Sequence, residues 1–226
     1  MKKAFSLLEL VFVIVVIGIL AAVIIPRINS DRLQEAAIQL ASHIRYTQHL
    51  AMLDDKYDAN NPVWFKQRWQ LVFGKSTTST DGKIAYTIFS DRGTASTANP
   101  TQGEMAIDPV DSQKYLSGGY SGSLDTTSPK ANKKMNLGYS YGIVIVTLSG
   151  GCNGGCNEIT GANCSGDLRI AFDHLGRPMK DSLYSYTSSY KSNYLIESQC
   201  NITLTSLSEG NVTIVIEPET GYTHIL

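Results

Sequence analysis

The first part of this chain places Lys2 and Lys3 ahead of an almost unbroken apolar run that extends to Ile25 and is followed by Pro26. A single carboxylate, Glu9, lies near the start of that run. A carboxylate inside a bilayer costs about 2.5–3.5 kcal/mol on insertion scales, so it needs a partner, and the run itself contains no basic residue. A free amine created by proteolysis at Phe5 of a neighbouring copy would suit Glu9. We therefore expect this segment to be an assembly device and not a simple anchor.

This N-terminal segment combines several short motifs. Residues 2–10 read KKAFSLLEL, residues 17–22 read IGILAA, and Pro26 follows. Together they resemble the N-terminus of the type IV pilins and type II secretion pseudopilins. The resemblance implies that a prepilin peptidase cuts between Ala4 and Phe5 and methylates the new amine of Phe5. It also implies that Glu9 meets the N-terminus of a neighbouring subunit. The chain departs from the family pattern at Ala4, where the family usually has Gly.

Two simpler interpretations explain less of the same segment. A secretory signal peptide has a shorter apolar core and a small-residue cleavage site, and no such site follows Ile25. An ordinary signal-anchor helix explains the length, since about 20 residues cross the hydrocarbon, and Lys2 and Lys3 place its start in the cytoplasm. It does not explain Glu9. The sequence thus predicts a single-pass inner-membrane protein with a cytoplasmic N-terminus and a periplasmic head, incorporated into a filament after processing.

A helical pattern resumes beyond Pro26, which lacks the amide of the preceding turn and is expected to bend the helix without ending it. Apolar side chains recur largely at three- and four-residue steps, at Leu33, Ala37, Leu40, Ile44 and Ala51. We therefore predict one long helix from about residue 5 to about residue 53. Its first half would lie in lipid, and its second half would be amphipathic.

The rest of the chain has the pattern of strands, with residues 94–136 as a long loop. The predicted strands are 63–73, 83–90, 139–148, 168–172, 194–198, 202–207, 212–217 and 222–226. The fold class expected is α+β, with the long N-terminal helix packed on a C-terminal antiparallel β-sheet head, the pilin fold. The domains expected are a leader peptide at 1–4, a transmembrane and assembly helix at 5–25, its amphipathic continuation at 26–54, and a periplasmic β-rich head at 55–226.

Three short motifs in the head resemble the H-type minor pseudopilins and the FimT-like minor pilins. They are RWQLVF at 68–73, FDHLGRP at 172–178, and the closing segment 214–221. FimT-like proteins that bind DNA use an arginine-rich element after the C-terminal Gly. Here Gly221 is followed by Tyr222, Thr223 and His224, which weakens a DNA-binding role.

Four cysteines, Cys152, Cys156, Cys164 and Cys200, all fall in the predicted periplasmic head. An even number of cysteines in an oxidising compartment favours two disulfides. The pairing we favour is Cys152–Cys156 with Cys164–Cys200, and Cys152–Cys164 with Cys156–Cys200 is nearly as good. A four-cysteine zinc site is weaker, because structural zinc sites usually pair cysteines at short spacing twice.

No catalytic or metal-binding pattern is evident. The four histidines are scattered, and no order of Ser, His and Asp or of Cys and His suggests a nucleophile. Asp108, Asp111 and Asp125 carry oxygen ligands for calcium but lack a recognisable loop pattern, so no metal and no cofactor is expected. Lys130, Lys133 and Lys134 form the single basic cluster, and the net charge is −1, so nucleic acid is an unfavoured partner. The chain is not expected to be an enzyme.

Two surface features remain open. The tyrosines Tyr184, Tyr186, Tyr190 and Tyr194 lie close together among serines and are equally consistent with a docking face or with a buried core. Asn211 begins an Asn-Val-Thr triplet, the N-glycosylation pattern, although a turn explains its Gly-Asn pair without a glycan.

The function expected from this resemblance is that of a minor pseudopilin or minor pilin. Such a subunit assembles through its N-terminal helix into an inner-membrane-based filament for type II secretion, type IV pilus biogenesis or DNA uptake. Its partners would be other pilin or pseudopilin subunits, the prepilin peptidase, the inner-membrane assembly platform and the inner membrane. The alternative is a FimT-like DNA-binding receptor of natural transformation.

Overall fold

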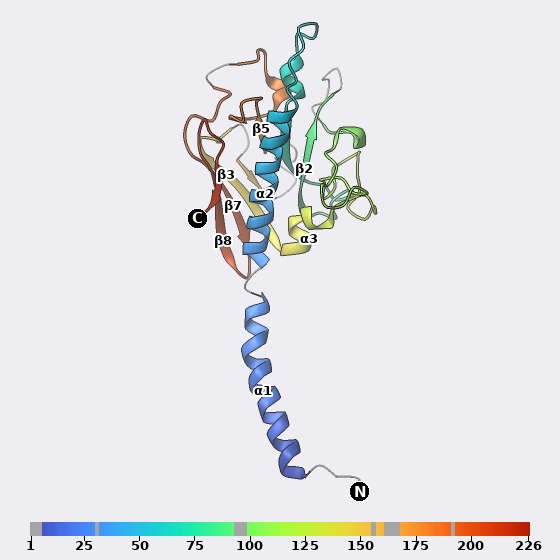
Figure 1. Ribbon diagram of the computed structural model, residues 1–226, viewed down its shortest axis with the longest axis vertical. Coiled ribbons are helices and arrows are strands. Elements are labelled where there is room, and N and C mark those ends of the chain that lie inside the picture. The colour runs from blue at the N-terminus through green and yellow to red at the C-terminus, as the bar shows by residue number, and fades with distance from the viewer. Residues whose placement is uncertain (1–5, 30–31, 93–98, 155–156, 161–167, 191–192) are drawn as a thin grey trace. The chain divides into compact units, whose positions relative to one another are not determined.

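The computed structural model describes residues 6–29, 32–92, 99–154, 157–160, 168–190 and 193–226 (Figure 1). Side chains between 22 and 29 also lie outside the description. The chain divides into two compact units, residues 1–32 and residues 33–226. The first unit contains helix α1 (Leu7–Asn29), and the second contains nearly all of helix α2 (Arg32–Leu53) and both sheets.

The single long helix predicted for residues 5 to 53 is not what the structure has. Two helices, α1 and α2, cover this stretch, and residues 30–31 between them lie outside the description. The backbone of Pro26 is part of α1, so α1 continues past the proline to Asn29. A proline inside a helix removes one backbone hydrogen bond and crowds the turn before it. Helix α1 nevertheless continues for three residues beyond Pro26.

The predicted membrane location is also contradicted. Over the residues that the structure describes, no helix has both the length and the apolar character of a membrane span. A single-pass inner-membrane protein with a periplasmic head is therefore not supported.

Helix α2 follows the periodicity expected of it. Its buried side chains lie along one face of the helix: Leu33, Ala36, Ala37, Leu40, Ala41, Ile44, Thr47 and Ala51. The predicted apolar stripe is thus confirmed as the buried face. At the start of the helix, the backbone N–H of Leu33 donates to Oε2 of Glu209 at 2.8 Å, which satisfies one of the amides that a helix leaves unpaired at its first turn.

The head holds two antiparallel sheets, where a single sheet was expected. The first sheet has the order β2-β1-β5-β6 and the second the order β4-β3-β7-β8-β9. The strands of the first are β1 (Trp69–Lys75), β2 (Ile84–Ser90), β5 (Arg169–Phe172) and β6 (Pro178–Lys180). Those of the second are β3 (Ile143–Gly150), β4 (Glu158–Ile159), β7 (Cys200–Ser206), β8 (Gly210–Ile216) and β9 (Thr223–Ile225).

One hydrophobic core joins α2 to both sheets. Leu40 and Ile44 of α2 belong to the same buried cluster as Phe73 of β1 and Ile202 of β7. Figure 1 shows α2 running along the sheets. A helix with one apolar stripe buries that stripe against the sheets in this way. Every residue of β2 is buried, so the first sheet is covered on both of its faces. The head is therefore built around α2 and not around a single sheet.

Short helices complete the head. They are η1 (Trp64–Gln67), η2 (Gln102–Glu104), η3 (Lys133–Met135), α3 (Leu137–Tyr141) and η4 (Leu183–Ser185). The predicted strand at 194–198 is absent from its described residues, where only a bridge between Met179 and Leu195 occurs. Two strands, β4 and β6, were missed because each has only two or three residues and so shows no period.

The predicted loop at 94–136 is irregular but well packed where the structure describes it, from residue 99 on. It forms isolated bridges to β2, pairing Thr87 with Ser117 and Phe89 with Met105. Leu116 and Met135 are completely buried. This segment therefore covers the outer edge of β2, and an edge covered in this way cannot pair with another chain.

Candidate functional site

The start of α1 is closed by a reciprocal pair of hydrogen bonds. The backbone N–H and the hydroxyl of Ser6 each donate to Oε2 of Glu9 at 3.0 Å, and the backbone N–H of Glu9 donates to the Ser6 hydroxyl at 3.3 Å. This is the capping-box arrangement, in which two otherwise unpaired amides are satisfied. Glu9 therefore has a local partner within its own chain.

That partner was visible in the sequence. A Ser followed three residues later by Glu, just before an apolar run, is the signature of a helix N-terminus. A basic partner was expected for Glu9, and Ser6 was not among the expected partners. The capping role does not remove Glu9 from assembly, because a carboxylate accepts more hydrogen bonds than these two. The assembly role predicted for Glu9 stays a prediction.

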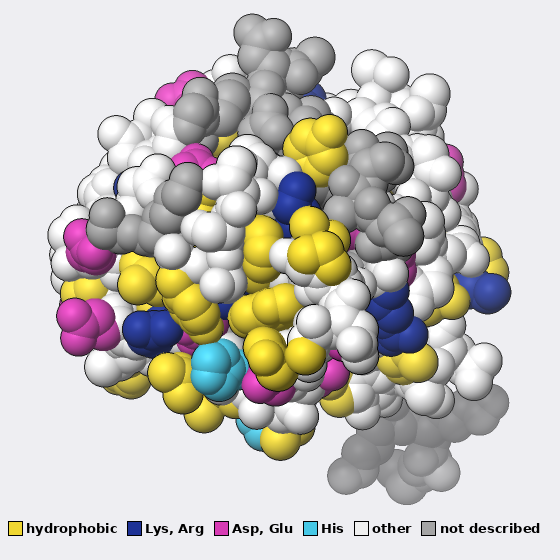
Figure 2. All heavy atoms as spheres, turned by 90° about the horizontal axis from the view of Figure 1, so that it is seen from above, with side chains coloured by type: hydrophobic (Ala, Val, Ile, Leu, Met, Phe, Trp, Pro, Cys, Tyr) yellow, Lys and Arg dark blue, Asp and Glu magenta, His cyan; other side chains and the backbone are white. Residues whose placement is uncertain are grey.

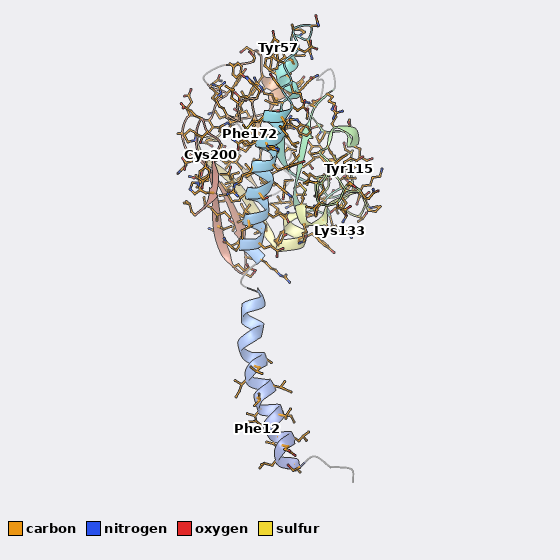
Figure 3. The ribbon with its side chains drawn as sticks, viewed as in Figure 1. Phe12, Tyr57, Tyr115, Lys133, Phe172 and Cys200 are labelled. Atoms are coloured by element: carbon orange, nitrogen blue, oxygen red, sulfur yellow. A yellow bond between two sulfur atoms is a disulfide. The ribbon has the colours of Figure 1, made fainter. Side chains whose placement is uncertain are left out.

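Helix α1 exposes apolar side chains all around its described part. Phe12 is 69% exposed and Leu7 is 81% exposed. Figure 3 shows Phe12 among side chains that project from α1. The large apolar side chains exposed on this helix are Leu7, Leu8, Leu10, Val11, Phe12, Val13, Ile14, Val15, Val16, Ile17, Ile19 and Leu20. A helix that is apolar on every side is normally buried. We therefore expect α1 to be covered by another apolar surface.

Several predicted site residues lie outside the described part of the chain. Ala4 and Phe5, the expected cleavage and methylation site, are among them, as is the side chain of Pro26. The cleavage, the methylation and the bend at Pro26 therefore stay predictions.

The disulfide that the structure contains joins Cys152 to Cys200, with their Cα atoms 5.0 Å apart. Both favoured pairings are therefore wrong, because each joined Cys152 to a different cysteine. The physical reason lies in the second sheet, where Gly150 at the end of β3 pairs with Cys200 at the start of β7. This register brings Cys152 next to Cys200, which spacing along the sequence could not indicate. Cys156 and Cys164 lie outside the described residues.

Asn211 lies on the exposed part of the hairpin formed by β7 and β8. It pairs with Thr205, and it follows Gly210, whose φ of +85° suits a glycine in the turn. The turn therefore accounts for the Gly-Asn pair, and the exposed side chain of Asn211 leaves room for a glycan. Glycosylation at Asn211 stays a prediction.

The three acidic residues that could supply oxygen ligands for calcium each accept a hydrogen bond or form an ion pair within the head. Asp108 accepts from the Asn132 amide at 2.7 Å, and Asp111 pairs with Lys114 at 3.0 Å. Asp125 accepts from the Thr127 hydroxyl at 2.6 Å. Over the described residues, no three His, Cys, Asp or Glu side chains are grouped as a metal would require.

A polar cavity of about 860 Å³ lies between α2 and the 99–136 segment. His43 and Lys133 are among its lining residues. The His43 Nδ1 atom lies 2.7 Å from the Tyr86 hydroxyl, which also accepts from the Gln39 amide at 2.8 Å. Burial lowers the pKa of His43 to about 4 and raises that of Tyr86. Both side chains are thus neutral near pH 7, and they form a structural network.

Two residues of the basic cluster, Lys133 and Lys134, line this cavity, and the cluster is partly neutralised. Lys134 lies 3.5 Å from Glu35 of α2, and the exposed Lys130 lies in the loop ahead of η3. Figure 3 labels Lys133 and Tyr115 on the same side of the head. A continuous phosphate track needs several unpaired Lys and Arg side chains in line, and this arrangement does not form one.

The tyrosine group divides into two pairs. Tyr186 and Tyr194 are buried and stack with ring centroids 3.6 Å apart, whereas Tyr184 and Tyr190 are exposed. Both interpretations of the group are thus half correct. The exposed Tyr190 lies over two arginines, Arg68 and Arg177, a contact that sequence spacing did not reveal because the three residues come from distant segments.

Comparison with known proteins adds no relative: no family model matches the sequence, and neither the curated proteins nor the solved structures contain a significant match.

Proposed function

We propose that this chain is a pilin-type assembly subunit, a minor pseudopilin or minor pilin, and that α1 packs against the α1 helices of other subunits. The observation that carries the proposal is the exposure of apolar side chains around the whole described part of α1. The N-terminal motif that resembles the pilins supports it independently, since the same segment holds the expected processing site.

The energetics favour a covered α1 over one that is exposed to water. Fully burying a Val, Leu, Ile or Phe side chain contributes about 1.5–3 kcal/mol. Phe12, Ile14 and Ile17 are each more than half exposed, so covering them alone contributes several kcal/mol. Equivalent helices packed side by side cover one another on all faces, as helices in bundles do.

Glu9 adds a polar element to this packing. In the isolated chain its carboxylate accepts two hydrogen bonds from Ser6. The N-terminal amine that cleavage before Phe5 would create on a neighbouring subunit supplies a charged donor for the remaining acceptor sites. Among otherwise apolar contacts, such a pair sets the axial register between subunits, as single polar groups do in coiled coils.

The filament that this subunit joins serves type II secretion, pilus biogenesis or DNA uptake. A DNA-receptor role receives no support from the basic residues, because Lys134 pairs with Glu35 and Arg177 pairs with Asp173 at 2.8 Å. Identifying the genes that accompany this one would separate the three systems.

A matched pair of substitutions tests the proposal. Phe12→Asp places a charge in the proposed interface, and Leu207→Asp places the same charge on the head, where Leu207 is 87% exposed in a turn. Phe12→Asp should disappear from the sheared filament fraction of the native host while the chain is still produced. Leu207→Asp should remain there at the wild-type level. If Phe12→Asp is incorporated as well as Leu207→Asp, α1 is not the assembly surface.

A further inference from the structure

Arg68 forms the centre of a stack of cations and aromatic rings. It precedes β1 and is only 3% exposed. Its guanidinium lies 5.1 Å from the centre of the Trp64 ring and 4.6 Å from that of Tyr190, and Arg177 lies 5.2 Å from the centre of the Tyr190 ring. The order Trp64, Arg68, Tyr190, Arg177 therefore alternates ring and cation. Each such contact is worth roughly 0.5–2 kcal/mol.

The stack lies at the end of the head where Tyr57 is labelled in Figure 3, since the ring of Tyr57 contacts that of Trp64 at 5.4 Å. Figure 2 views this end and shows hydrophobic side chains gathered with Lys and Arg side chains among them. Tyr57 is 65% exposed. Tyrosine, tryptophan and arginine are the residues enriched at the energetic centres of protein interfaces.

Arg68 is incompletely paired within the described part of the chain. Its Nη1 donates to the carbonyl of Ser189 at 2.9 Å and contacts the sulfur of Met179 at 3.2 Å. Its Nε and Nη2 atoms are buried and have no hydrogen-bond partner there. The Tyr190 hydroxyl favours the charged form of Arg68, but it makes no hydrogen bond of normal geometry with these two atoms. Leaving a buried donor unpaired is costly, and more so for a charged group.

The unpaired atoms define the ligand that fits. Nε and Nη2 form one edge of the planar guanidinium, and their two parallel N–H groups match the two oxygens of a carboxylate. The carboxylate of Asp173 is already bound to Arg177 at 2.8 Å and accepts two backbone N–H groups of its own turn. The charge on Arg68 therefore lacks a carboxylate partner from the described part of the head.

The ring of Tyr190 lies over the Arg68 guanidinium, 4.6 Å from ring centre to Cζ, and Tyr190 is the exposed side chain of the stack. It is 37% exposed, and its hydroxyl is 3.3 Å from His174 Nδ1, longer than a strong hydrogen bond. Its ring also contacts the guanidinium groups of Arg68 and Arg177. A rotation of the Tyr190 side chain gives up its cation–π contacts with Arg68 and Arg177 and opens access to Arg68.

We propose that Arg68 binds a carboxylate of a peptide segment from another protein, and that Tyr190 moves aside to admit it. The carboxylate, an acidic side chain or a C-terminus, occupies the Nε–Nη2 edge, and the neighbouring residues pack on Trp64 and Tyr57. The exposed aromatic rim favours a peptide over a free small acid, because it offers apolar contacts that acetate cannot use. This inference does not depend on the role of α1.

The test uses the full chain and follows the Arg68 Nε–H resonance by NMR. The probes are acetate and two N-acetylated peptides, Gly-Gly-Leu with a free C-terminal carboxylate and the same peptide as its amide. We expect the free-acid peptide to bind at least about tenfold more tightly than acetate, the equivalent of 1.4 kcal/mol. The amide should cause no saturable shift.

Three variants complete the design. Tyr190→Ala removes the cover and should tighten binding of the free-acid peptide severalfold, whereas the control Tyr222→Ala, at a 61% exposed tyrosine outside the stack, should leave it unchanged. Arg68→Lys keeps the positive charge but loses the two parallel N–H groups of the guanidinium edge. The fluorescence of Trp64 should therefore no longer respond to the peptide.

The proposal fails if neither the wild type nor Tyr190→Ala shows a saturable shift with the free-acid peptide. Equal affinity for acetate and for the peptide would overturn the assignment to a peptide segment. If Arg68→Lys does not fold, the wild type and Tyr190→Ala still test the proposal, because both retain Arg68.

Discussion

Removal of the Cys152–Cys200 disulfide should destabilise the head by an amount that follows from its position in the chain. The bond joins residues 48 positions apart, across the ends of β3 and β7. In the chain-entropy model, closing a loop of that size in the unfolded chain is worth about 4 kcal/mol. Domains of this kind are stable by about 5–15 kcal/mol in total, so the loss is a large share.

The perturbation is the double variant Cys152→Ser with Cys200→Ser, which leaves no freed thiol at either position to attack another cysteine. Urea unfolding of a chain that starts at Arg32, followed by tryptophan fluorescence, reports on the head alone. With a slope near 2 kcal/mol per molar urea, the midpoint should fall by about 2 M. A reductant should lower the midpoint of the parent chain to a similar extent and that of the double variant much less.

A midpoint shift below about 0.5 M, with an unchanged slope, would refute this reasoning. It would mean that Cys152 and Cys200 are not bonded in the folded protein, or that the unfolded chain is already held compact near them. Thiol counting on the denatured parent chain separates these cases, because the account expects neither Cys152 nor Cys200 to react.

Two further predictions concern single side chains. Burial holds the pKa of His43 near 4, below its ordinary 6.5, so the folded state resists protonation and loses up to roughly 3 kcal/mol as the pH falls from 6.5 to about 4. The free energy of unfolding of His43→Gln, from urea titrations at pH 7 and pH 4.5, should fall less between these pH values than that of the wild type. An equal fall in both proteins would contradict the prediction. Ser6→Ala should weaken the start of α1 by about 0.5–2 kcal/mol, seen as faster amide exchange at Glu9, whereas Ser6→Asp should retain the cap.

Periodic patterns allowed the sequence to predict the amphipathic stretch that forms α2 and most strands, but not the division of residues 5–53 into two helices. The stripe from Leu33 to Ala51 is buried as expected, and runs such as 83–90 and 212–217 became β2 and β8 with little shift. These patterns are informative because burial of one face repeats every 3.6 or every 2 residues. The short strand β6 has no such repeat and was missed.

The candidate sites could not be predicted from the sequence, because they are formed by contacts between segments that are distant in sequence. The pairing of Cys152 with Cys200 follows from the register of β3 and β7, and the stack around Arg68 brings together η1, the 182–190 segment and the turn at Arg177. Neither has a local signal. The hydrogen bonds between Ser6 and Glu9 are different, because the Ser-x-x-Glu spacing by itself indicates a capping box, although only a charged partner was expected for Glu9.

Mapping the contacts of Phe12 in assembled filaments tests the central claim most directly. A photoreactive phenylalanine analogue at position 12, activated in the native host, should form adducts with other pilin-type subunits. Mass spectrometry should place the adducts within the apolar N-terminal helices of those subunits. Adducts confined to proteins without such a helix, or none at all from a chain present in the filament fraction, would contradict the assembly role of α1.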